Sequence, residues 1–82
     1  MVDIRDQEQY ELPTFLELRL KTRLSRTKFA QRAGIAIKTQ ARMETGKGIS
    51  ALTAQKSLDL LNELLGTSYK LIDFKDVNVK RL

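Results

Sequence analysis

The stretch SRTKFAQRAGIAIKTQARMETG, residues 25–46, decides the fold. Ser25 is a good N-cap, because its hydroxyl can accept a hydrogen bond from a backbone N–H of a first helical turn. Three apolar side chains then share one face of a helix: Phe29, Ala30 and Ala33. Gly34 ends that helix, since glycine enters the left-handed conformation without steric cost.

A second short helix is expected directly after this turn. It covers residues 37–45 and ends at Gly46. Ala30 lies four residues before Gly34, where two helices that cross steeply would touch and a larger side chain would force them apart. The spacing is the one that a helix-turn-helix requires.

The stretch resembles the helix-turn-helix of phage repressors and Cro proteins, the lambda-repressor-like or XRE family. The resemblance rests on the apolar and turn positions Phe29, Ala30, Ala33, Gly34, Ile35 and Met43. It implies a mainly α, repressor-like domain of four to five helices. It also implies a sequence-specific DNA-binding transcriptional regulator, a homodimeric repressor that inserts helix 37–45 into the major groove. Finally, it implies an ion pair between Arg19 of the preceding helix and Glu44.

The outer face of residues 37–45 carries the expected contacts to DNA bases. The N-terminal half of a helix in the major groove reaches the base edges. Lys38 and Arg42 lie one turn apart and can donate to guanine O6 and N7. Ile37 and the methyl group of Thr39 can pack on thymine methyl groups, with Ala41 beside them.

Phosphate contacts are expected from Arg26, Thr45 and Lys47. Arg26 opens the first helix of the motif, whose N-terminal dipole favours an anion. Lys47 follows the end of the second helix. The chain has 15 Lys and Arg against 10 Asp and Glu, a net charge of +5. This surplus favours a polyanionic partner, here double-stranded DNA.

Gln40 departs from the family pattern, which has Val or Ile at this position between the two helices. An unpartnered buried amide would cost about 1–3 kcal/mol. The amide can find a partner at the corner, or its stem can pack while the amide reaches solvent. Alternatively, a rotated helix would direct Gln40 to an adenine. We favour the first two and then expect Gln40→Val to raise the melting temperature.

The DNA-binding domain is expected to span residues 12–66, after a flexible arm at residues 1–11. Pro13 suits the first position of a helix, whose apolar stripe includes Phe15, Leu16 and Leu20. The segment GKGIS, residues 46–50, is interpreted as a linker, with Ser50 as the next cap.

A leucine-rich helix is expected from Ala51 to Leu65, with Gly66 as its end. Its apolar row consists of Leu58, Leu61 and Leu65, widened by Leu60 and Leu64 and extended by Leu52. The segment is longer than the family pattern, so the sequence predicts a lengthened or broken helix.

In residues 67–82 the sequence pattern changes from helical spacing to the two-residue alternation of a strand, and we interpret the segment as a β tail. One strand is expected over residues 69–74, followed either by a hairpin turn at Lys75–Asp76 and a second strand, or by an irregular end. An isolated hairpin is marginal in water, so the tail needs a partner. The expected partner is the same tail in a second chain, through Tyr69, Leu71, Ile72 and Phe74. The alternative is a strand packed only on its own domain.

Several functional classes are disfavoured by composition. Histidine and cysteine are absent, which removes the commonest acid–base catalyst and the usual zinc ligands. We therefore expect no enzyme, metal or cofactor. No apolar run approaches the ~18 residues of a membrane span, and the start lacks a signal-peptide core, so we expect no membrane and a cytoplasmic location. The alternative function is a protein-interaction module, such as an antitoxin that binds a toxin.

Overall fold

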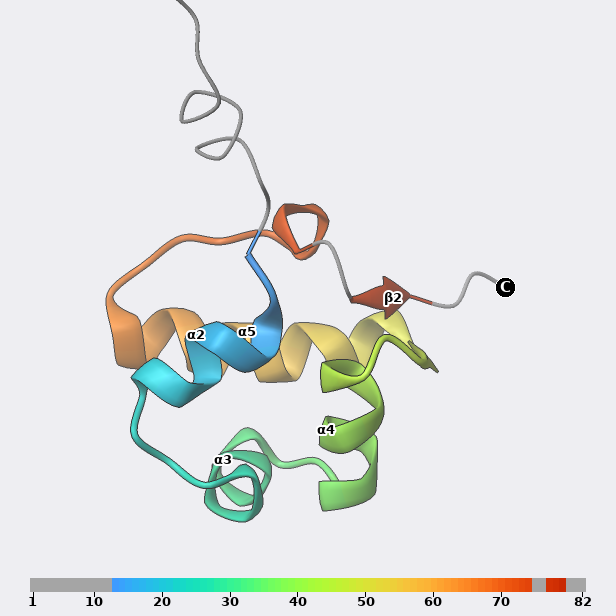
Figure 1. Ribbon diagram of the computed structural model, residues 1–82, viewed down its shortest axis with the longest axis horizontal. Coiled ribbons are helices and arrows are strands. Elements are labelled where there is room, and N and C mark those ends of the chain that lie inside the picture. The colour runs from blue at the N-terminus through green and yellow to red at the C-terminus, as the bar shows by residue number, and fades with distance from the viewer. Residues whose placement is uncertain (1–12, 75–76, 80–82) are drawn as a thin grey trace, which may run out of the picture.

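The computed structural model describes residues 13–74 and 77–79. The elements, in chain order, are the helices α2 (Phe15–Lys21), α3 (Arg26–Ala33) and α4 (Ile37–Glu44), the strand β1 (Gly48–Ile49), the helix α5 (Ala51–Leu65), the 3-10 helix η1 (Leu71–Asp73) and the strand β2 (Asn78–Val79) (Figure 1). This part of the chain is mainly helical, with a short two-stranded parallel sheet. The predicted arm at 1–11 and the predicted turn at Lys75–Asp76 lie outside the described residues.

The local signals place most helix ends as predicted. Ser25 Oγ accepts from the Lys28 amide at 3.1 Å, and Gly34 ends α3 in the left-handed conformation at φ 78°. Ser50 caps α5, which continues unbroken for 15 residues to a left-handed Gly66. The helix is thus lengthened and not broken.

The start and the face of α2 differ from the prediction. Thr14, and not Pro13, is the boundary residue: its hydroxyl accepts from the Glu17 amide at 3.1 Å, so Pro13 lies before the cap. The buried residues of α2 are Phe15, Leu18 and Arg19. Because Arg19 turns inward to Glu44, the next residue, Leu20, points outward and is 59% exposed.

The core lies where α2, α3, α4 and α5 meet. Its largest fully buried apolar side chains come from all four helices: Phe15, Phe29, Met43, Leu58 and Leu61. The rings of Phe15 and Phe29 pack edge to face, with centroids 5.9 Å apart. Ala30 is fully buried on α3, as expected for a residue at a close crossing of helices. By contrast, Leu52 is 70% exposed and does not extend the apolar row of α5.

The predicted strand over residues 69–74 is wrong. This segment contains η1, in which the Asp73 carboxylate accepts from the Lys70 amide at 2.8 Å. The ring of Phe74 is almost completely buried, 5.3 Å from the ring centroid of Phe15 and 5.5 Å from that of Tyr69. Asn62 of α5 holds the segment through both the amide and the carbonyl of Tyr69. Tyr69, Leu71 and Phe74 of this segment pack on their own domain, while Ile72 is exposed.

The strand that does form in the tail pairs within the chain. After α5 the chain runs back across this helix, so that β2 lies beside β1 (Figure 1). The pairing is parallel, with Gly48 opposite Asn78 and Ile49 opposite Val79. The predicted linker at 46–50 therefore contains a strand, and the described part of the tail packs on its own domain, while pairing with a second chain stays a prediction. None of the helices in the described part of the chain has the length and apolar character needed to cross a membrane.

Candidate nucleic-acid interface

The candidate interface is the outer side of α4 and the turn after it. Ile37 is 44% exposed and Lys38 is exposed, while Thr39 and Ala41 are partly buried. Thr45 and Lys47 are exposed just after the helix. In Figure 1, α3 lies on the side of the molecule away from the tail, while the C-terminal end of α4 lies near β1, which pairs with β2. The structure thus brings most of the predicted DNA contacts together on one surface.

The turn between α3 and α4 is closed by backbone hydrogen bonds. The amide of Ile35 donates to the carbonyl of Ala30 at 3.0 Å, across the left-handed Gly34. The N-cap of α4 is Ala36, which makes no side-chain hydrogen bond to the first turn. The start of α4 therefore lacks the side-chain cap that Ser25 supplies to α3.

A buried carboxylate, Glu44, ties α4 to its neighbours. Arg19 Nε donates to Glu44 Oε2 at 2.6 Å, and Arg19 Nη2 donates to Glu44 Oε1 at 3.2 Å. Arg19 Nη1 also donates to the carbonyl of Leu24 at 2.9 Å. The side chain of Glu44 is 0% exposed and that of Arg19 is 7% exposed. The pair implied by the family resemblance is present, and it fixes the end of α4 against α2.

Gln40 belongs to the same network. Its Nε2 donates to Glu44 Oε2 at 2.7 Å, and its Oε1 accepts from the Ser57 hydroxyl of α5 at 2.6 Å. Both Gln40 and Ser57 are 0% exposed. Every buried side-chain nitrogen and oxygen within residues 13–74 and 77–79 has a hydrogen-bond partner. Gln40 thus takes the first of the three solutions: it faces inward and its amide is paired.

Ser57 is the hydrogen-bond partner of Gln40, and the sequence alone did not identify it. It lies on the buried face of α5, where Ala54, Leu58 and Leu61 surround it in helical spacing. A serine at such a core position is the signal for a buried polar partner, but only the folded chain identifies that partner as Gln40.

This pairing reverses the expected effect of Gln40→Val. The substitution leaves the Ser57 hydroxyl buried without its acceptor and removes one donor from Glu44. We expect a loss of about 1–3 kcal/mol in the free energy of unfolding, measured by urea denaturation. The double variant Gln40→Val/Ser57→Ala should recover part of this loss. A gain in stability for the single variant would contradict the network.

Two of the predicted DNA-contacting arginines are engaged within the chain. Arg26 Nε donates to Glu44 Oε1 at 3.2 Å, and the Arg26 side chain is 38% exposed. Glu44 faces the start of α3 and attracts this guanidinium, so part of it is engaged within the chain, and the phosphate contact of Arg26 stays a prediction. Arg42 is partly buried, and its Nη2 donates to the Gly48 carbonyl at 3.0 Å. One nitrogen of Arg42 is therefore committed to β1.

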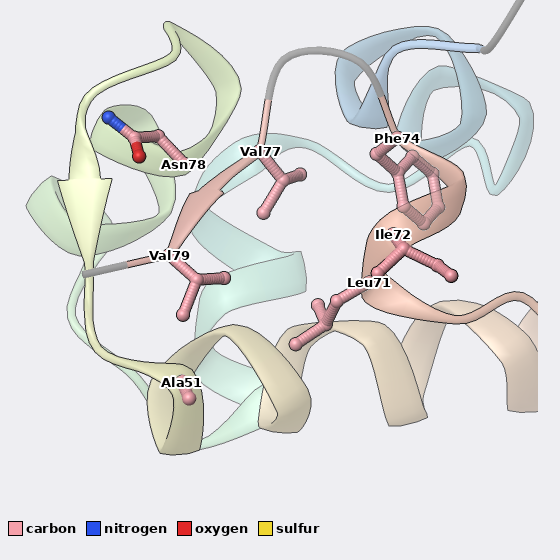
Figure 2. Close-up of a pocket in the computed structure, with 7 residues that line it drawn as sticks. All are labelled: Ala51, Leu71, Ile72, Phe74, Val77, Asn78 and Val79. Atoms are coloured by element: carbon pink, nitrogen blue, oxygen red, sulfur yellow. The ribbon is translucent and has the colours of Figure 1, made fainter. Parts of the chain in front are cut away.

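A second surface is an apolar groove of about 540 Å³ between η1 and β2, over the first turn of α5 (Figure 2). Its lining consists of Ala51, Leu71, Ile72, Phe74, Val77, Asn78 and Val79. Of the four predicted dimerisation residues, Tyr69, Leu71 and Phe74 pack against the core of their own chain, and their part in dimerisation stays a prediction. Ile72 alone among them is strongly exposed, at 82%.

Comparisons with family models, with curated proteins and with solved structures find no match for this chain. The two surfaces are therefore interpreted from their own residues. The outer side of α4 combines basic, polar and apolar groups, whereas none of the described residues that line the groove is charged.

Proposed function

We propose that the chain is a sequence-specific DNA-binding transcriptional regulator, a homodimeric repressor of the lambda-repressor-like type. The observation that carries the proposal is the arrangement of α3, the left-handed Gly34 and α4. The ion pair of Glu44 with Arg19 fixes the end of α4 to α2 on the buried side, while Ile37 and Lys38 are exposed on the outer side. A helix that is fixed on one side and polar on the other can enter a major groove without refolding. Such a protein would act in the cytoplasm and would not be an enzyme.

The chemistry of α4 suits base recognition. Lys38 can donate to guanine O6 and N7, and Ile37 can contact a thymine methyl group, with Thr39 and Ala41 completing the surface. Arg42 retains further N–H groups beyond the nitrogen that donates to Gly48. Thr45 and Lys47 extend the surface toward the phosphates.

Footprinting of the purified protein tests this proposal. The DNA site is selected from a random library by repeated binding to the protein. The DNA upstream of the protein's own reading frame is a second target. Lys38→Ala should reduce discrimination at one base pair by about 1–3 kcal/mol while leaving binding to random DNA almost unchanged. Lys56→Ala, an exposed lysine of α5, is the control. Equal affinity for all sequences would oppose the proposal.

We expect Lys47 to contact a DNA phosphate and not to contact the edges of the bases. Lys47→Ala should weaken binding to specific and random DNA alike. It should also reduce the slope of log K against log salt by about 0.9 for each protomer bound. Titrations between low and physiological salt measure this slope. An unchanged slope would show that Lys47 does not contact phosphate.

The groove supports a second candidate, a protein-interaction module such as an antitoxin. Ile72 is 82% exposed at its rim, and Leu52, next to the lining residue Ala51, is 70% exposed. Exposed apolar surface of this kind marks interaction sites. Sedimentation of the purified protein distinguishes the candidates: a homodimer, with a second copy of the chain at the groove, favours the repressor. Copurification with a different polypeptide, in place of a homodimer, favours the antitoxin.

A further inference from the structure

We infer that β2 is a positioning strand for Arg42: it holds β1, and through the Gly48 carbonyl it fixes the Arg42 guanidinium beside the DNA-binding face. The inference rests on the proposed function, because it assigns a specificity-determining role to a segment outside the helix-turn-helix. It begins with the contacts of Arg42 itself.

Arg42 is bound to the following turn at two points. Its carbonyl accepts from the Lys47 amide at 2.9 Å, and its Nη2 donates to the Gly48 carbonyl at 3.0 Å. Between these residues the chain reverses through Gly46 at φ 78°. The direction of the Arg42 side chain is therefore determined by the position of Gly48.

The position of Gly48 depends in turn on β2. The strand β1 has two residues, which cannot form a stable extended segment alone, and its partner in the described sheet is β2. Gly48 lies opposite Asn78, and Ile49 lies opposite Val79. Ile49 is 4% exposed in the core, and Val79 packs against the same cluster. The tail thus anchors β1 through both backbone pairing and packing.

The chain of contacts from β2 to Arg42 has a consequence for recognition. A long arginine side chain on a helix surface samples many rotamers and must be ordered when it binds a base. Here the guanidinium is already directed by Gly48, so less of this ordering remains for the complex. If β1 loses its partner, Arg42 keeps its charge and its place on α4 but loses its fixed direction.

The test uses the full-length chain. Asn78→Pro/Val79→Pro removes both N–H groups of β2 and breaks its pairing whichever amide donates. Asn78→Ala/Val79→Ala is the matched control: it removes the same side chains, including the packing of Val79, and keeps both N–H groups, so that the difference between the two variants reports the backbone pairing. Both double variants are made in two backgrounds, one that keeps Arg42 and one that carries Arg42→Ala. Binding is measured on random DNA and on the DNA site that the unaltered protein selects from a random library. Circular dichroism verifies that the helices persist.

In the Arg42 background, the proline variant should lose about tenfold in the ratio of specific to random binding, relative to the alanine control. In the Arg42→Ala background, the two variants should have the same ratio. An equal loss in both backgrounds would show a general loosening of the fold and would overturn the inference. So would an unchanged ratio in the Arg42 background.

A measurement without DNA separates this inference from the proposed function. NMR exchange of the Arg42 side-chain N–H groups should be slower in the alanine control than in the proline variant. If the protein shows no sequence preference for any DNA, the proposed function fails, and this measurement then decides whether β2 fixes Arg42. Equal exchange in both variants would overturn the coupling.

Discussion

Replacing Glu44 by alanine is expected to cost about 3–5 kcal/mol in the free energy of unfolding. The substitution leaves the guanidinium of Arg19 buried, with the Leu24 carbonyl as its remaining acceptor among the contacts described. It also removes the acceptor of the Gln40 amide. A chain of 82 residues has a total stability of roughly 4–12 kcal/mol, so the variant should melt far below the unaltered protein.

Glu63→Ala is the control for this experiment. It removes the same charge from an exposed position on α5 and should change stability by less than about 0.5 kcal/mol. Thermal unfolding followed by circular dichroism measures both variants. Similar melting temperatures for Glu44→Ala and Glu63→Ala would mean that the buried network does not hold the helices together.

Phe74→Ala should lower the free energy of unfolding by about 3–5 kcal/mol, although the residue lies outside the four α-helices. The ring is 4% exposed and packs on Phe15, a residue of the central core. Its removal opens a cavity against α2, and urea denaturation should show one cooperative transition at a lower midpoint.

Ile72→Ala provides the comparison within the same turn. Ile72 is 82% exposed, so this truncation should change stability by less than about 0.5 kcal/mol. If Phe74→Ala were equally neutral, the tail would not contribute to the core of the helical domain.

The parts of the fold that could be predicted depend on neighbouring residues. Ser25 caps α3 and Gly34 ends it because a hydroxyl and a missing Cβ act on the backbone within one turn. The same holds for Ser50 and Gly66 at the ends of α5. Surface positions of α4 followed from helical spacing once the two helices were recognised.

The parts that could not be predicted depend on distant residues. The partner of Gln40 is Ser57, on another helix, and the contact of Arg26 with Glu44 exists only when α3 and α4 cross. The tail misled the prediction for a related reason. Apolar residues such as those of this segment can form a strand, but they equally suit a 3-10 turn in which Leu71 and Phe74, three residues apart, both reach the core.

The parallel pairing of β1 and β2 also has a consequence for the order of folding. Parallel strands need a long crossover, here α5 and the segment that returns along it, so β2 can reach β1 only after a large loop has closed. Helices form through local contacts and are faster than such closure. We therefore expect strand pairing, and with it the fixed direction of Arg42, to be the late event. A chain arrested just before it would have native helices and an incompletely built recognition surface.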